Sequence, residues 1–114
     1  MFLTVCNLWM LHVMSNAQLT DFHKNLSHKP YCSDDLMYGL KIRSKKVAIL
    51  MPYIQGNQPC MIHYLFFDID RLEAAMAWHD AELPRPYWIT QNKKNGHSHL
   101  CYKLKIPLCT SDLG

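Results

Sequence analysis

Two acidic residues close a short apolar run near the middle of the chain. Asp68 and Asp70 follow the run Leu65-Phe66-Phe67 and are separated by Ile69. Because side chains alternate between the faces of a β-strand, both carboxylates project the same way. Two carboxylates so placed repel each other, and a hard cation such as Mg2+ or Mn2+ relieves that repulsion and can bridge to substrate phosphates. The pattern indicates a metal site for phosphate chemistry of the nucleotidyl-transfer type.

Asp70 also fits a second role, as the cap of a helix. It is followed by Arg71-Leu72-Glu73 and then by the run Ala74-Ala75-Met76-Ala77-Trp78. With Asp70 at the N-cap and Glu73 at N3, the segment has the pattern of a capping box. Since a carboxylate has two oxygens, one residue can serve both purposes, and the sequence leaves both open.

A group of histidines follows the dipeptide Asn95-Gly96. This dipeptide is the strongest hairpin signal in the chain, because a type I′ turn needs positive φ at both central residues. It predicts a hairpin that joins a strand over residues 87–91 to one over residues 97–104. One face of the second strand carries His97, His99, Cys101 and Lys103, and the other carries Leu100, Tyr102 and Leu104. We expect the first face to carry chemistry and the second to meet the core.

Three interpretations of the histidine face stay open on the residues alone. A zinc site from His97, His99 and Cys101 is disfavoured, because alternate residues of one strand rarely supply three tetrahedral ligands and no CxxC or HxxxH spacing completes the set. Histidines that are solvated or satisfied in the core are the common alternative. In the third interpretation a histidine contacts the phosphates of a bound nucleotide, and the upstream carboxylate pair favours it.

Several separate blocks between Phe22 and Pro107 add a resemblance to a known family. The blocks are His28-Lys29-Pro30-Tyr31-Cys32, Tyr53-Ile54-Gln55 with Asn57-Gln58-Pro59, Phe67-Asp68-Ile69-Asp70-Arg71, Ala74-Ala75 with Trp78, and Asn95-Gly96-His97-Ser98-His99-Leu100 with Tyr102. In this order they resemble the N-terminal part of the plasmid replicases, the Rep initiator-primases of colicin-type plasmids, which belong to the archaeo-eukaryotic primase superfamily.

The resemblance implies roles for individual residues. Asp68 and Asp70 match the superfamily's first motif, whose acids ligate the catalytic metals, so Mg2+ or Mn2+ is the implied cofactor. Ser98 and His99 match the second motif, whose histidine contacts the incoming nucleotide, with His97 as a candidate partner. The implied reaction is attack of a 3′-hydroxyl on an α-phosphate, which would make a primer at the plasmid origin. Origin DNA and nucleoside triphosphates are the implied partners.

Two parts of the family pattern have no counterpart before Gly114. These are a third acidic motif on a later strand and a C-terminal origin-binding region. We therefore expect residues 14–114 to be a truncated replicase domain with an incomplete active site. A non-catalytic remnant that binds DNA or a partner is the alternative. A rolling-circle Rep nuclease, in which two histidines hold a metal and a tyrosine attacks DNA, ranks lower because Ser98 stands where that motif needs a bulky apolar residue.

The charge of the chain permits nucleic-acid binding without requiring it. The net charge is +3, from 12 Lys and Arg against 9 Asp and Glu. The basic residues include one cluster of Lys41, Arg43, Lys45 and Lys46 and another of Lys93 and Lys94. Solvated faces are the usual explanation of such clusters. If the domain binds nucleic acid, these residues are the expected phosphate contacts.

Cysteine usage and the first residues bear on location. The five cysteines are odd in number and have no disulfide or metal spacing, which favours a reducing cytoplasm. Residues 1–13 are apolar and uncharged but too short to span a bilayer, and they lack the features of a secretory signal. We favour a leader that is not native, with Met14 as the true start, over an anchor or an added core strand. No membrane association is expected.

The expected architecture is α+β in a single domain of 114 residues, of which 49% are hydrophobic. An amphipathic helix over residues 15–26 precedes a small, mainly antiparallel sheet that includes a strand over residues 61–67 and the histidine hairpin. A helix over residues 72–81 should pack on one face, as in a partial primase-like catalytic domain. Loss of later strands would leave a sheet edge and apolar surface exposed, which predicts association or marginal stability.

Overall fold

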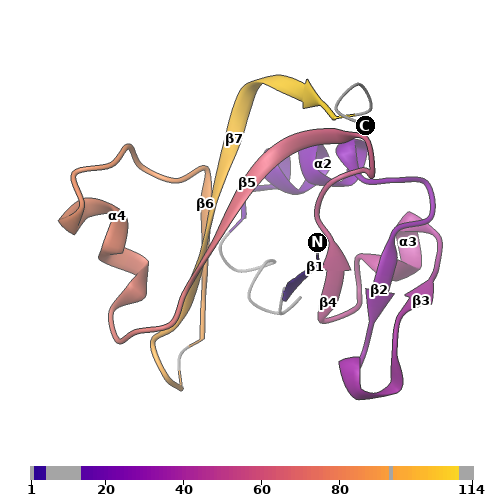
Figure 1. Cartoon of the computed structure of the whole chain (residues 1–114), viewed down its shortest axis with the longest axis horizontal. Coiled ribbons are helices and arrows are strands. Elements are labelled where there is room, and N and C mark those ends of the chain that lie inside the picture. The colour runs from indigo at the N-terminus through magenta and orange to yellow at the C-terminus, as the bar shows by residue number, and fades with distance from the viewer. Residues whose placement is uncertain (1, 5–13, 93, 111–114) are drawn as a thin grey trace.

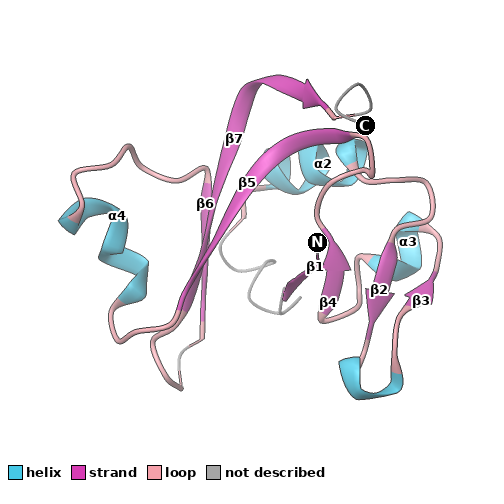
Figure 2. Ribbon diagram, in the orientation of Figure 1, coloured by secondary structure: helices cyan, strands magenta, loops and turns pink. Residues whose placement is uncertain are grey.

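The computed structural model describes residues 2–4, 14–92 and 94–110, and it confirms the predicted α+β class (Figure 2). The α-helices of the described residues are α2 (Asn16–Asn25), α3 (Lys45–Ala48) and α4 (Ala77–Asp80), and single 3-10 turns are η1 (Leu36–Tyr38) and η2 (Ala74–Met76). None of these helices has the length and apolarity that crossing a lipid bilayer requires.

The described strands form two antiparallel sheets, where one small sheet was expected (Figure 1). Sheet A has the order β1-β4-β2-β3, with β1 (Phe2–Thr4), β2 (Tyr31–Ser33), β3 (Lys41–Ile42) and β4 (Tyr53–Gln55). Sheet B has the order β5-β7-β6, with β5 (Met61–Ile69), β6 (Trp88–Gln91) and β7 (Ser98–Cys109). The two sheets separate because residues 56–59, Gly-Asn-Gln-Pro, interrupt the chain between β4 and β5.

Asn57 fixes the start of β5 after this break. Its side-chain oxygen accepts hydrogen bonds from the backbone N–H groups of His63 (2.9 Å) and Tyr64 (3.1 Å), and its amide nitrogen donates to the carbonyl of Tyr64 (2.9 Å). The β5–β7 ladder changes register between Ile62 and Tyr64. The asparagine therefore satisfies backbone groups where the ladder is irregular.

Helix α2 confirms the helix predicted over residues 15–26. Ser15 and Gln18 form a reciprocal capping box, and Leu26 ends the helix in an extended conformation. Phe22, which has no exposed surface, packs edge-on against Trp88 of β6 with 5.4 Å between ring centroids. The core thus lies between α2, sheet A and one face of sheet B.

The face of sheet B that meets this core carries the histidines, so the expected division into a core face and a chemical face is wrong. Cys101 of β7 lies opposite Phe66 on β5 and Trp88 on β6, and it is fully buried. Since facing residues of neighbouring strands share a side, His99 and Cys101 lie on the core side. Leu100, on the other side, is also buried. Both faces contribute to the interior at this end of the sheet.

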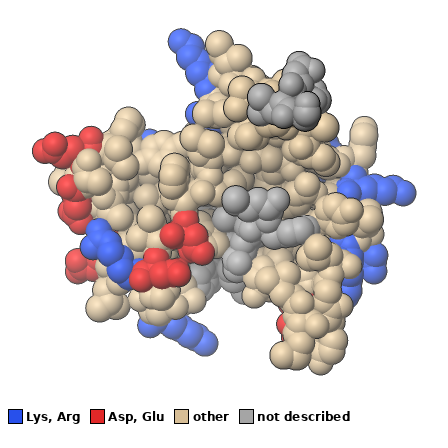
Figure 3. Space-filling view, viewed as in Figure 1, with Lys and Arg blue, Asp and Glu red and all other residues tan. Residues whose placement is uncertain are grey.

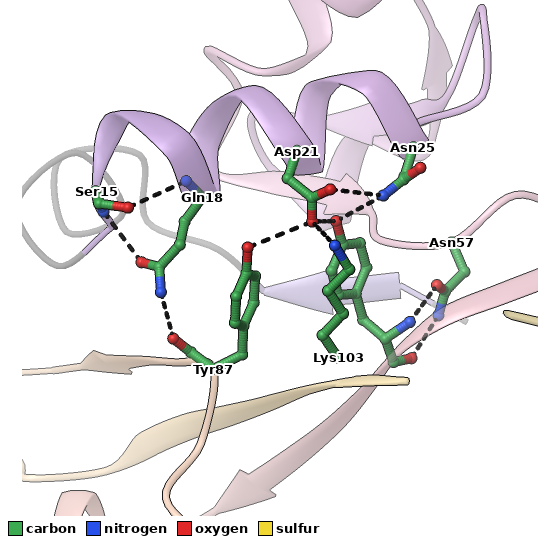
Figure 4. Close-up of polar contacts among 8 residues, drawn as sticks. Ser15, Gln18, Asp21, Asn25, Asn57, Tyr87 and Lys103 are labelled. Carbon is green, nitrogen blue, oxygen red and sulfur yellow. Dashed lines mark hydrogen bonds and ion pairs between the residues drawn. The ribbon is translucent and has the colours of Figure 1, made fainter. Parts of the chain in front are cut away.

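A polar cluster attaches α2 to sheet B (Figure 4). One oxygen of Asp21 on α2 accepts hydrogen bonds from Lys103 (2.8 Å) and the Tyr64 hydroxyl (2.8 Å), and the Tyr87 hydroxyl lies 3.5 Å from it. Burial raises the pKa of Asp21, but these contacts outweigh burial and the net pKa is lowered. The same contact with Asp21 raises the pKa of Lys103. The carboxylate and the ammonium therefore hold each other in their charged forms.

Residues 71–86 form an arm beside sheet B, in place of the helix predicted over residues 72–81. Only the four-residue α4 and the turn η2 are helical there. Glu73 has a left-handed conformation (φ 57°), which breaks a helix at its start. The backbone N–H of Ala74 donates to the carbonyl of Gly96 (3.2 Å), so this tertiary contact replaces the helix ladder.

The expectation for residues 1–13 stays a prediction. Within that range the structure describes only β1, in which Leu3 is paired with Ile54 of β4. Residues 1 and 5–13 lie outside the described residues.

Candidate active site

Two acids and two histidines face each other where β5 ends and β7 begins. In the ladder Asp68 lies directly opposite His99, and Ile69 lies opposite Ser98. The Nε2 atom of His99 is 3.2 Å from Oδ1 of Asp68, and the Nδ1 atom of His97 is 3.5 Å from Oδ1 of Asp70. Both distances allow an ion pair when the imidazole is protonated.

These four side chains lie on one side of the β5–β7 pair. Asp68 and Asp70 are two residues apart, as are His97 and His99, so each pair projects to the same side, and residues two apart along a strand are separated by about 7 Å. The acid side chains are open to solvent, with 63% of Asp68 and 72% of Asp70 exposed, whereas only 15% of the His99 side chain is exposed. A ligand from solution can therefore reach the carboxylates directly.

The alternative role of Asp70 as a helix cap is wrong in this structure. Glu73 precedes η2 and Met76 precedes α4, and neither makes a side-chain capping hydrogen bond. Asp70 is separated from both helical turns and its carboxylate faces His97 instead. Asp70 therefore does not cap a helix, the structural role that the sequence left open.

The turn before β7 sets the position of His97. The hairpin predicted from Asn95-Gly96 is confirmed, but Gly96 alone of the two has positive φ (74°), so the turn is not type I′. Gly96 N donates to Asn92 O (2.8 Å), and Asn92 N donates to His97 O (2.8 Å). The Asn95 side chain accepts a hydrogen bond from the N–H of His97 (3.0 Å). The Asn92 side chain accepts a hydrogen bond from the N–H of Lys94 (2.9 Å), so two asparagine side chains stabilise the described residues of this turn.

Gly96 also joins this turn to the chain that follows Asp70. A Cβ atom at Gly96 would lie 3.2 Å from the backbone nitrogen of Glu73 and 3.3 Å from Cα of Leu72. Because Ala74 N donates to Gly96 O, the two segments touch along their backbones. Because glycine has no side chain, the turn that precedes His97 can lie directly against the segment that follows Asp70.

Two buried polar atoms near the site lack hydrogen-bond partners among the described residues. They are Nδ1 of His99 and the hydroxyl of Ser98. Ser98 lies between the two histidines in sequence, so its side chain projects to the opposite face, where it is buried. The structure thus brings together Asp68, Asp70, His97 and His99, and it does not bring the Ser98 hydroxyl to their face. Thr90, which the sequence did not single out, lies opposite His99 on β6.

The donors of this face suit a hard divalent cation. Carboxylate oxygens are the ligands that Mg2+ and Mn2+ prefer, and Mg2+ commonly takes one or two of them and completes its shell with water and substrate phosphates. No cluster of three or more His, Cys, Asp or Glu side chains in the described ranges is arranged to hold a metal ion. Asp68 and Asp70 could therefore hold a cation that is shared with a phosphate ligand, and the three-ligand zinc site receives no support.

The predicted basic contacts lie elsewhere. Lys41 on β3 pairs with Asp34 (3.1 Å), and Arg43 and α3 follow it on the sheet A side of the molecule, away from the acids (Figure 1). Lys94 is exposed in the turn before β7. Lys93 lies outside the described residues. The first basic cluster is therefore not part of the acid and histidine face.

Comparison with known proteins identifies the family. No curated protein and no solved structure matches the chain. A family model described as the Replicase family matches residues 25–114, which include both acids and both histidines of the site. Because this match covers most of the chain, the protein belongs to the Replicase family, a membership that suggests a plasmid replication protein acting on DNA.

Proposed function

We propose that the face formed by Asp68, Asp70, His97 and His99 is the nucleotidyl-transfer site of a primer-synthesising plasmid replicase. The proposal extends the family membership to the Rep initiator-primases of colicin-type plasmids and to the archaeo-eukaryotic primase superfamily. Its support is the sequence likeness together with the two facing histidine and acid pairs. It takes nucleoside triphosphates and plasmid origin DNA as partners and the cytoplasm as the place of action.

The two carboxylates would hold Mg2+ or Mn2+ beside the triphosphate. Such a cation stabilises negative charge on the attacking and leaving oxygens of a phosphoryl transfer. Asp68 is part of the β5 ladder and Asp70 directly follows it, so the end of the strand sets both acids on one side of the sheet, where each carboxylate faces a histidine. Both acids are exposed, which leaves room for water and phosphate in the remaining coordination positions.

The histidines would bind the phosphates of the incoming nucleotide. His99 Nε2 faces an Asp68 oxygen, and its other nitrogen is buried without a partner. When Asp68 is engaged by a cation, this imidazole can turn its N–H toward a phosphate oxygen instead. His97, which is more exposed, can do the same from its place opposite Asp70. Together they would hold the α-phosphate before a 3′-hydroxyl group, with pyrophosphate leaving.

The single observation that carries the proposal is the register that sets Asp68 opposite His99. The test is a titration of a fluorescently labelled nucleoside triphosphate with and without Mn2+. We expect Asp70→Asn and His99→Ala each to weaken Mn2+-dependent binding about 10- to 100-fold, the range for a lost charged hydrogen bond. His79→Ala and Asp80→Asn, which change exposed residues of α4, are the matched controls and should bind normally.

Primer synthesis itself is tested by incorporation of labelled nucleotides on single-stranded plasmid origin DNA. Incorporation that depends on Mn2+ or Mg2+ and is lost in Asp68→Asn supports the proposal. Nucleotide binding that is unchanged in both Asp70→Asn and His99→Ala would show that this face is not the nucleotide site.

A further inference from the structure

The hairpin made by β2, η1 and β3 carries an unusual amount of exposed apolar surface. The exposed apolar residues are Tyr31, Leu36, Met37, Tyr38, Leu40 and Ile42. At the tip, 85% of Met37 and 79% of Tyr38 is open to solvent. The hairpin extends away from sheet B at the far side of sheet A (Figure 1). Soluble proteins seldom gather such a patch without a ligand for it.

Basic residues flank this patch in the sequence. Residues 24–46 contain Lys24, Lys29, Lys41, Arg43, Lys45 and Lys46, against two acids, Asp34 and Asp35. Asp34 pairs with Lys41, and Asp35 accepts a hydrogen bond from the N–H of Met37 (2.9 Å). Figure 3 shows Lys and Arg side chains on the side of sheet A and α3, whereas on the side of the arm Asp and Glu side chains lie together with further Lys and Arg side chains.

Most of these positive charges are uncompensated. Among the ion pairs of the described residues, only that of Lys41 with Asp34 involves this segment. Arg43 and Lys45 donate to backbone carbonyls, those of Ile42 and Lys24, which leave their charge in place. The hairpin therefore combines exposed aromatic and aliphatic side chains with free positive charge.

We propose that residues 31–46, the hairpin together with the start of α3, bind single-stranded nucleic acid. Unpaired bases stack on aromatic side chains, and lysine and arginine beside them contact the phosphates. Tyr38 at the tip is the stacking residue, and Arg43 and Lys46 are the phosphate contacts. A duplex hides the faces of its bases, so an apolar tip gains little from it. The proposal does not depend on the acid and histidine face.

The test measures fluorescence anisotropy of a labelled oligothymidine of about 20 nucleotides, long enough for such sites. A duplex of equal length is the comparison, and neither metal nor nucleotide is present. We expect Tyr38→Ala to weaken single-strand binding about 5- to 100-fold and Tyr38→Phe to stay within about twofold, because the phenyl ring still stacks. Leu72→Ala, an equally exposed apolar residue on the arm, is the control and should bind normally.

The phosphate contacts are tested through salt dependence. The double variant Arg43→Gln with Lys46→Gln should lower the slope of log affinity against log salt by about 1.4, since each contact with a single strand contributes about 0.7. Lys105→Gln, an exposed lysine on β7, is the control for loss of charge and should leave the slope unchanged. Circular dichroism checks that each variant is folded.

The proposal is wrong if the wild-type chain binds single strands no better than duplex, or if Tyr38→Ala and Leu72→Ala have equal effects. It is also wrong if single strands are not bound and Tyr38→Ala instead abolishes self-association in sedimentation, which would make the hairpin a protein contact. Because the assay contains no metal and no nucleoside triphosphate, its failure is distinct from failure of the nucleotidyl-transfer proposal.

Discussion

Replacing Gly96 with alanine should destabilise the protein and disable the acid and histidine face together. Gly96 has φ 74°, and the left-handed region costs a residue with a Cβ atom about 1–2 kcal/mol. The added Cβ would also lie 3.2 and 3.3 Å from backbone atoms of Glu73 and Leu72, which cannot rotate away. Crowding of this kind costs about 1–3 kcal/mol. We therefore expect Gly96→Ala to lower the free energy of unfolding by about 2–5 kcal/mol in urea titrations.

Gly39 supplies the matched control. It too has positive φ (86°), but a Cβ atom there would meet nothing within 4 Å. Gly39→Ala should therefore show the cost of backbone strain, about 1–3 kcal/mol, without crowding. At temperatures where both variants are folded, Gly96→Ala should lose Mn2+-dependent nucleotide binding because His97 moves away from Asp70, and Gly39→Ala should keep it. A loss of less than about 1 kcal/mol in Gly96→Ala, or normal nucleotide binding, would refute this account of the turn.

Three further predictions concern the packing of α2 and β5. The contacts of Asp21 lower its pKa below the ordinary 3.8 despite burial, so the stability that they give is present above that pH and is lost as the pH falls through the folded pKa. Asp21→Asn should remove this part of the acid unfolding, which circular dichroism can follow. Asn57→Ala leaves two N–H groups and one carbonyl of β5 without their partner and should cost about 2–3 kcal/mol in urea, whereas a loss within error would show that water replaces the amide. Gly56→Ala sets a Cβ against the ring of Phe66 and should cost about 1–3 kcal/mol in thermal unfolding, and Phe66→Leu added to it should recover part of that loss.

Local signals in the sequence were sufficient for several elements. The amphipathic pattern over residues 15–26 predicts α2, and the structure adds the capping box of Ser15 and Gln18 at its start. Asn95-Gly96 predicts a hairpin at the right place, since glycine readily adopts the positive φ that Gly96 has in the turn. The shared side of Asp68 and Asp70 follows from the alternation of a strand alone. These features depend only on residues close together in the chain.

Features set by distant contacts could not be predicted. Which face of sheet B meets the core depends on the docking of α2. There Asp21 forms an ion pair with Lys103, which is far from it in the sequence. The expected helix after Asp70 is cut short because Ala74 bonds to Gly96 instead of to its own helix. The pairing of Asp68 with His99 needs a register that neither strand encodes by itself. The metal and nucleotide roles of these residues stay predictions.

The register of β5 and β7 has a consequence for synthesis of the protein on the ribosome. The histidine at 99 is translated 31 residues after the acid at 68, and β7 is the only strand in the described part of the chain that pairs with β5. At 5–20 residues per second, the nascent strand waits roughly 2 to 6 seconds for its partner. During that interval its backbone hydrogen-bonding groups are open to any other extended chain. Chaperone capture of the nascent polypeptide between these two points would protect it from aggregation.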